Sequence, residues 1–153
     1  MTRIDQASRL IRATPEAIYD AMTRAEAMVQ WLPPDGMSGQ MLEFDARPGG
    51  HYKLILRYDD PAVAGKAGDN TDVVTVRYLD LVPHSRISQA VDFVSDDPRF
   101  AGTMIMDWTL EPGPGGTTAT IRATSVPEGI SAADHQEGLA SSLHNLAAYT
   151  EAN

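Results

Sequence analysis

One segment near the C-terminus constrains the fold more than any other, because it alone has long helical periodicity. It runs from Ser131 to Tyr149 and reads SAADHQEGLASSLHNLAAY. Leu139, Leu143 and Leu146 recur at spacings of four and three residues, which predicts an apolar stripe along one face of an α-helix. Small residues surround this stripe, and Gly138 costs a helix interior about 1 kcal/mol relative to Ala. We therefore expect a thin helix whose backbone another segment or a ligand approaches closely.

Short polar residues mark the expected starts of three helices. Thr14, directly before a proline, predicts a helix over Pro15–Met22. Thr23 and Ser131 each have an acidic residue three positions later, a pattern that resembles a capping box, so further helices are expected to start there. The helix after Thr23 is expected to end at Pro33–Gly36, because two prolines and a glycine cannot continue it.

The remainder of the chain alternates between apolar and polar residues with period two, which predicts strands. A first strand is expected at Ile4–Ala13, with Leu10 and Ile11 as its most apolar part, and six more follow the two short helices. Those six are expected at residues 40–46, 51–58, 73–82, 87–93, 103–110 and 119–124. Turns link them except at 59–72, a stretch that is long for a hairpin loop. Six successive strands make an antiparallel meander, which must curl around the last helix to cover its stripe.

The alternation also predicts which side chains of most strands face the core. Leu42 and Phe44 are expected on one face, whereas the strand at 73–82 is apolar on both faces and cannot be oriented. The other inward side chains are expected to be Tyr52, Leu54, Leu56, Tyr58, Ile87, Gln89, Val91, Phe93, Met104, Met106, Trp108, Leu110, Ala119, Ile121 and Ala123. The fold class is thus α+β, with a curved antiparallel sheet around one long helix.

Composition limits the classes of function. The 153 residues fit a single domain and carry a net charge of −9, which argues against a nucleic-acid partner because such partners need a basic face. The chain has no Cys, so it has neither disulfides nor a thiolate nucleophile. It shows no signal-peptide pattern and no apolar run of membrane-spanning length, so we expect a cytoplasmic protein without membrane insertion.

Four segments, in this order and spacing, resemble one known family. They are Ser8–Ile11 followed by Thr14–Glu16, then Trp31–Pro34, Asp45–Tyr52, and Val126–Ile130 leading to Asp134–Gly138 and Ser142–Leu146. The chain resembles the START-like (SRPBCC) superfamily, and within it the bacterial homologues of the activator of the heat-shock-protein-90 ATPase. The resemblance covers essentially the whole chain and implies a single-domain helix-grip fold with a hydrophobic cavity between sheet and C-terminal helix.

The resemblance also implies which residues wall that cavity. They are Trp31, Tyr52, Leu54, Val91, Met106, Trp108, Leu139 and Leu143. Relatives bind lipids, sterols or aromatic polyketides, and some catalyse cyclisation or dehydration. Two positions depart from the family pattern, because relatives often carry an aromatic residue where this chain has Gln89 and a large one where it has Leu139. Both departures predict a roomier or more polar cavity.

Each candidate site residue also has an alternative interpretation. Trp31, Tyr52 and Trp108 either stack on a flat ligand or serve as ordinary core aromatics. His135 is either an acid/base or ligand-binding residue on the helix face of Leu139, or a partly exposed first-turn histidine. Gln89, if buried, needs a partner, for which a neighbouring main chain is the leading candidate over a ligand or water.

Three functions remain open from the sequence. Binding of a small hydrophobic or aromatic molecule is the first, in a cavity of roughly 300–1,000 Å³. The second is an interaction module that stimulates a chaperone ATPase, and the third is a cyclase- or dehydratase-type enzyme using His135. The four histidines lack metal-ligand spacing and no nucleophile motif occurs, so no metal, cofactor or covalent catalysis is expected. A homodimer is compatible with the sequence.

Overall fold

The computed structural model describes residues 3–33, 36–65 and 70–152. Its elements are β1 (Ile4–Ile11), α1 (Pro15–Met22), α2 (Ala25–Trp31), β2 (Met37–Phe44), β3 (His51–Tyr58), β4 (Thr71–Val82), β5 (Arg86–Val94), a 3-10 turn η1 (Pro98–Phe100), β6 (Thr103–Gly113), β7 (Gly116–Thr124) and α3 (Ala132–Glu151). The kinds and order of these elements are those of the predicted helix-grip fold, which is therefore confirmed.

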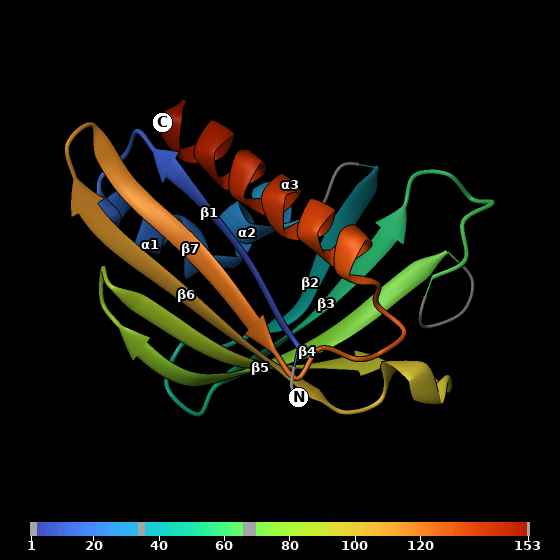
Figure 1. Cartoon of the computed structure of the whole chain (residues 1–153). Helices are drawn as coiled ribbons and strands as arrows, with labels where there is room; N and C mark the ends of the chain where they lie inside the picture. The colour runs from blue at the N-terminus through green and yellow to red at the C-terminus, as the bar shows by residue number, and fades with distance from the viewer. Residues whose placement is uncertain (1–2, 34–35, 66–69, 153) are drawn as a thin grey trace.

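The seven strands form one antiparallel sheet in the order β1-β7-β6-β5-β4-β3-β2. The meander runs from β2 to β7, and β1 then adds to its free edge by pairing with β7 from Ile4 opposite Thr124 to Ile11 opposite Thr117. The sheet curves, and α3 lies across its concave side (Figure 1). The first strand and the last two elements of the chain, β7 and α3, thus meet on one side of the molecule.

Helices α1 and α2 fill one end of the space between the sheet and α3 (Figure 1). The indole nitrogen of Trp31 in α2 donates a hydrogen bond of 2.8 Å to the carbonyl oxygen of Ala21 in α1. The Asn145 side-chain nitrogen in α3 donates to the Pro33 carbonyl oxygen at 3.0 Å, which anchors the end of α2 to the long helix. These contacts close that end of the fold and leave the other end to be covered by α3 alone.

The long helix α3 is buried along only part of its length. The Ser131 hydroxyl accepts a hydrogen bond of 3.0 Å from the Asp134 backbone nitrogen, so the predicted N-cap is confirmed. Its buried residues are Leu139, Leu143, Leu146, Ala147 and Thr150, and the residues before Leu139 are exposed or half-buried. Among the described residues, no helix is long and apolar enough to span a membrane.

One of the other two predicted helix starts is correct and one is wrong. Thr14 caps α1, because its hydroxyl accepts from the Ala17 backbone nitrogen at 3.1 Å. Thr23 does not cap α2, since its hydroxyl donates to the Tyr19 carbonyl oxygen at 2.8 Å and so belongs to the end of α1. The N-cap of α2 is Arg24, and the arginine side chain binds the Glu26 carboxylate at 2.9 Å. The chain turns too soon after α1 for Thr23 to reach the next helix.

The predicted register of the strand at 40–46 is wrong for its first half and correct for Phe44 and Ala46, which pack against the core. A β-bulge between Met41 and Glu43 interrupts the pairing of β2 with β3. It leaves Leu42 46% exposed, while Met41 and Phe44 pack against the core. An extra residue in one strand reverses the faces that follow it, so strict alternation could not find this point.

Several boundaries differ from those expected. The strand β1 ends at Ile11 instead of Ala13, and β6 continues through Pro112 to Gly113, so the last hairpin turn is shorter than Pro112–Gly116. The predicted helix stop at Pro33–Gly36 includes residues 34 and 35, and the predicted loop at 59–72 includes residues 66–69, all of which lie outside the described residues.

Two adjacent residues of β1 provide a test of the observed register. Ile11 is fully buried, whereas Leu10 beside it is 51% exposed. We expect Ile11→Ala to lower the free energy of unfolding by about 2–5 kcal/mol because it leaves a core cavity. Leu10→Ala removes similar apolar volume from the surface and should change stability by about 0.5 kcal/mol or less. Urea unfolding of both variants measures this difference, and equal losses would contradict the register.

Candidate functional site: a cavity beneath the N-terminal half of α3

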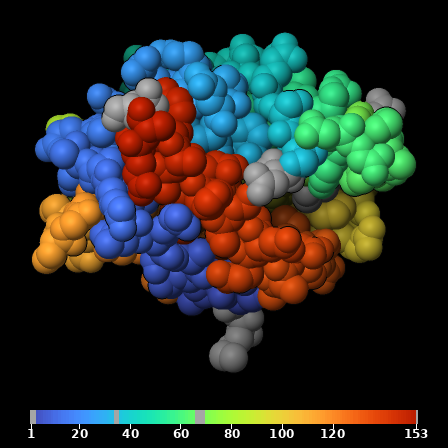
Figure 2. Space-filling model, turned by 90° about the horizontal axis from the view of Figure 1, so that it is seen from above, coloured from blue at the N-terminus to red at the C-terminus, as the bar shows by residue number. Residues whose placement is uncertain are grey.

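A cavity of about 1350 Å³ lies between the concave face of the sheet and the N-terminal half of α3. Ligand sites commonly measure about 300–1,000 Å³, so this one exceeds the size expected from the sequence. It is larger because it opens to solvent, with exposed residues such as Ala140 and His144 on its rim. Figure 2 shows the N-terminal part of α3 (orange-red) beside the chain after β3 (green) and around η1 (yellow).

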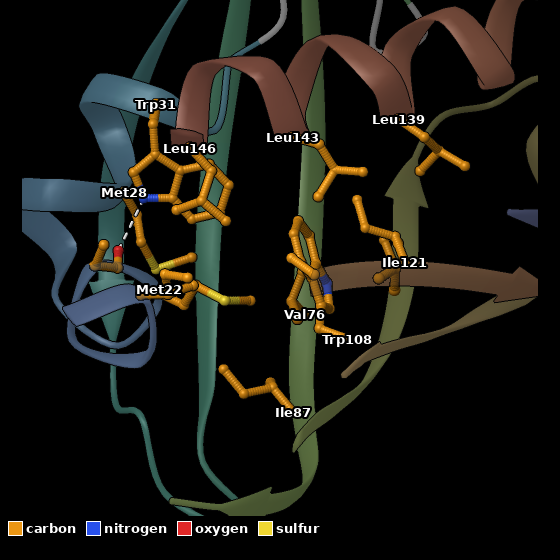
Figure 3. Close-up of a cluster of buried hydrophobic side chains, with 14 of the residues drawn as sticks. Met22, Met28, Trp31, Val76, Ile87, Trp108, Ile121, Leu139, Leu143 and Leu146 are labelled. Atoms are coloured by element: carbon orange, nitrogen blue, oxygen red, sulfur yellow. Dashed lines mark hydrogen bonds between the residues drawn. The ribbon is translucent and has the colours of Figure 1, made fainter. Parts of the chain in front are cut away.

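The structure brings together nearly all of the predicted ligand-binding residues around this cavity. Those that line it are Trp31, Tyr52, Leu54, Gln89, Val91, Met106, Trp108, His135 and Leu139. Leu143 does not line the cavity, which corrects its expected place in the wall. It is only 1% exposed and lies in the core one turn beyond Leu139 (Figure 3). Ligand binding by these residues remains a prediction.

Several wall residues were not identified from the sequence as part of a site. Met22 and Met28 reach the cavity from α1 and α2, and Val74 and Val76 reach it from β4. Figure 3 shows Met22 and Met28 beside Trp31, with Val76 beneath Leu143. Both faces of β4 are apolar in sequence, so only the pairing with β3 and β5 reveals that Val74 and Val76 point inward.

Two tryptophans form the rigid inner wall. The rings of Trp31 and Trp108 meet edge to face, with centroids 5.7 Å apart and planes at 77°. The indole nitrogen of Trp108 donates to the Gln89 side-chain oxygen at 3.1 Å. Gln89 therefore has a side-chain partner, and the expected main-chain partner is wrong. Because both indole N–H groups are bonded within the protein, the tryptophans offer a ligand ring surface only.

Tyr52 and Tyr78 add hydroxyl groups next to this wall. Their ring centroids lie 5.8 Å apart, and the residues are 4% and 1% exposed. Burial is the main cause that raises the pKa of both hydroxyls above the usual value, and an interaction with Gln89 partly offsets it for Tyr52. Both tyrosines are therefore neutral hydrogen-bond donors at physiological pH.

A hydrogen bond between His135 and Asp5 joins the first turn of α3 to β1. The His135 Nδ1 atom lies 2.6 Å from the Asp5 carboxylate, which also pairs with the Arg3 guanidinium at 3.0 Å. Asp5 was not identified from the sequence because it lies 130 positions from His135. The pair fixes the imidazole ring, and no described residue bonds its Nε2 atom, an arrangement that histidine bases use. His135 is thus a half-buried residue near the start of α3, and its role as an acid/base or ligand-binding residue remains a prediction.

The mouth of the cavity is polar. The Tyr58 hydroxyl donates to the buried Asp72 carboxylate at 3.3 Å. Burial and then the charge of Asp72 raise the pKa of Tyr58. Nearby, the Arg99 guanidinium binds Asp97 at 2.7 Å and lowers the pKa of that carboxyl through hydrogen bonds. The cavity is thus apolar at its base and ringed by charged and hydroxyl groups at its entrance.

Gly138 lies on the cavity without a close neighbour. A side-chain carbon placed there would meet no heavy atom within 4 Å outside the helix. The expectation that sheet or ligand approaches this backbone is therefore wrong for the sheet, because the space beside Gly138 is open. No three His, Asp or Glu side chains converge as metal ligands anywhere in residues 3–33, 36–65 and 70–152.

Comparison with known proteins places the chain in a family. The family model for activator of Hsp90 ATPase homolog 1-like proteins matches residues 12–151. This chain belongs to that family. Protein CV1439 from Chromobacterium violaceum is 34% identical in sequence. Its crystal structure matches with a TM-score of 0.85 over 97% of this chain and 96% of the other. No match occurs among the curated proteins.

More distant solved structures share the fold. An AHSA1-like protein from Aeromonas hydrophila is 17% identical, with a TM-score of 0.75 over 98% of this chain and 93% of the other. A protein from Rhodobacter sphaeroides is 20% identical, with a TM-score of 0.77 over 99% of both chains. At these identities the likeness shows the START-like helix-grip fold alone.

The buried tyrosines predict how stability depends on alkaline pH. Above about pH 10 the tyrosines of the unfolded chain lose their protons, while Tyr52 and Tyr78 stay protonated in the fold. The unfolded state then holds fewer protons, so the free energy of unfolding falls as pH rises past 10. Urea titrations between pH 9 and about pH 11, with tyrosinate absorbance, measure this loss.

The matched variant is the double substitution Tyr52→Phe and Tyr78→Phe. It should make the alkaline decline shallower, because two of the groups with a raised pKa are removed while Tyr19 and Tyr58, whose pKa values are also raised, remain. Full tyrosinate absorbance of the wild type near pH 10 with the fold intact would contradict the raised pKa values.

Proposed function

We propose that this protein binds a small, flat, hydrophobic molecule in the cavity under α3. The supporting observation is the cavity itself, whose base is lined by aromatic, methionine and aliphatic side chains. Trp31 and Trp108 are held by hydrogen bonds to Ala21 and Gln89, so their rings are positioned before a ligand arrives. A preformed wall lowers the entropy lost on binding.

The shape of the cavity favours small-molecule binding over a filled core. Leu139 is the last large apolar residue of α3 toward its N-terminus, and Gly138 beside it leaves open space. The helix therefore covers the sheet without filling the volume beneath it. When an apolar ligand replaces water in such a cavity, binding is favoured by about 25 cal/mol per Å² of apolar surface removed from water.

Binding of N-phenyl-1-naphthylamine, an uncharged fluorescent probe, tests this function. We expect saturable fluorescence enhancement with the wild-type protein. Leu139→Trp should weaken binding at least about tenfold, which is about 1.4 kcal/mol, because the larger side chain occupies the cavity. Ala148→Trp places the same indole at an exposed position of α3 and should leave binding unchanged. Absence of saturable binding, or equal affinities of the two variants, would refute the proposal.

Native mass spectrometry of the purified protein complements the probe. A small molecule that remains bound after purification would identify the natural ligand directly. Its loss in Leu139→Trp and retention in Ala148→Trp would place it in the cavity.

A second candidate function is stimulation of a chaperone ATPase. It is favoured by the family model, which is named for the activator of the Hsp90 ATPase. The measurement is the ATPase rate of the host's Hsp90 homologue with and without this protein, together with a pull-down. An unchanged ATPase rate together with no binding in the pull-down would rule out this function, whereas the cavity proposal would be unaffected.

A further inference from the structure

Gln89 is a polar side chain in an apolar environment. It is 5% exposed and lies on β5 between Ile87 and Val91, which are 1% and 5% exposed. Across the neighbouring strands it pairs with Tyr78 on β4 and Met106 on β6. Gln89 nevertheless lines the cavity, so one edge of its amide group faces that space.

The hydrogen bond to Trp108 determines which edge of the Gln89 amide faces the cavity. An indole nitrogen can only donate, so the Gln89 atom that lies 3.1 Å from it must be the oxygen. The amide nitrogen, with two N–H donors, then lies on the other side of the group. Trp108 is itself 4% exposed and braced edge to face by Trp31, so the amide cannot readily turn over.

Tyr52 supplies a further donor beside Gln89. It also lines the cavity, and its ring centroid lies 5.8 Å from that of Tyr78, the residue opposite Gln89 in the sheet. Among the described residues, no bond pairs the Tyr78 hydroxyl behind it, which is buried. The cluster of Gln89, Tyr52 and Tyr78 therefore holds amide N–H and hydroxyl groups to which the described residues supply no carbonyl or carboxylate acceptor. Buried donors without acceptors destabilise a protein unless water or a ligand supplies the acceptor.

We propose that the Gln89 amide nitrogen and the Tyr52 hydroxyl together bind a carbonyl oxygen of the ligand. This inference rests on the proposed function of the cavity and specifies its ligand class as flat, uncharged and apolar with one carbonyl group at its inner end. The carbonyl oxygen accepts both donors through its two lone pairs.

The surroundings favour a neutral carbonyl over an anionic group. By strand pairing, Tyr52 lies opposite Phe44 and Val76, and Gln89 lies opposite Tyr78 and Met106, so no paired neighbour is charged. The two arginines that line the cavity, Arg9 in β1 and Arg99 in η1, belong to elements that do not pair with β3 or β5. A carboxylate beside Gln89 would therefore lose its hydration without a cation on a paired strand, which is costly in an apolar site. A neutral ketone, quinone or amide loses far less hydration.

A matched pair of tricyclic probes tests the donor pair. 9-Fluorenone carries a carbonyl group where fluorene carries a methylene, and the two skeletons are otherwise alike. Affinities for both follow from displacement of N-phenyl-1-naphthylamine. The ratio of the fluorenone affinity to the fluorene affinity is measured for the wild type and for Gln89→Met. Dividing the wild-type ratio by the variant ratio cancels the difference in hydration between the probes. We expect this quotient to be about fivefold or more, the effect of one hydrogen bond.

Two further variants control the experiment. Tyr52→Phe removes only a hydroxyl group and should also reduce the preference for fluorenone. Met106→Leu changes the wall next to Gln89 without removing a donor, so both affinities should change alike and the ratio of the fluorenone to the fluorene affinity should stay as in the wild type. If Gln89→Met does not fold, Tyr52→Phe supplies the same test.

The carbonyl stretching band of bound fluorenone gives a readout in the unmodified protein. Two hydrogen bonds should shift the infrared band to lower frequency than in hexane, and Tyr52→Phe should reverse part of this shift. Binding of both probes with an unshifted band and an unchanged preference would overturn this inference and leave the cavity function standing. Failure of both probes to bind would overturn both proposals.

Discussion

The structure depends on a mismatch between a wide curved sheet and a helix with a short apolar stripe. Seven strands present a concave face that must be covered, but α3 buries side chains only from Leu139 onward. At its C-terminal half, α1 and α2 supply the missing volume. At its N-terminal half no other helix in the described part of the chain does so, and the cavity of about 1350 Å³ is the consequence. The candidate site is thus a volume that the packing leaves unfilled.

An unfilled apolar volume persists only if its walls cannot collapse. Each tryptophan is fixed by its N–H bond as well as by ring contact, Trp31 to Ala21 and Trp108 to Gln89. The pair formed by Asp5 and His135 holds the overhanging first turn of α3 against β1. The two side chains are 12% and 5% exposed, so removing one partner would leave the other largely buried without its hydrogen bond. The pair therefore resists movement of the helix toward the sheet.

Most of the fold and much of the cavity wall could be predicted from the sequence. Alternation along β3, β5 and β6 predicted the inward side chains correctly, because these strands have one apolar and one polar face. It failed at Leu42, where a bulge shifts the register, and it could not orient β4, whose faces are both apolar. Local patterns report which face is apolar but not where a strand gains a residue.

Polar partners were the least predictable part of the site. The bonds from Asp5 to His135 and from Trp108 to Gln89 join residues that are 130 and 19 positions apart. Neither has a spacing signature, since they form across strand pairings and helix packing that only the folded chain defines. The burial of Gln89 could be anticipated from its apolar neighbours along β5, and its need for a partner followed, but the partner itself could not be named.

Gly138 shows that the open volume is maintained at some expense of helix stability. Ala in a helix interior is about 1 kcal/mol better than Gly, and a side-chain carbon at this position would meet no other part of the fold. Packing therefore does not require glycine there. A side chain at position 138 would project into the rim of the cavity, next to Leu139 and His135. The glycine is best explained by the space that it leaves at the rim of the cavity.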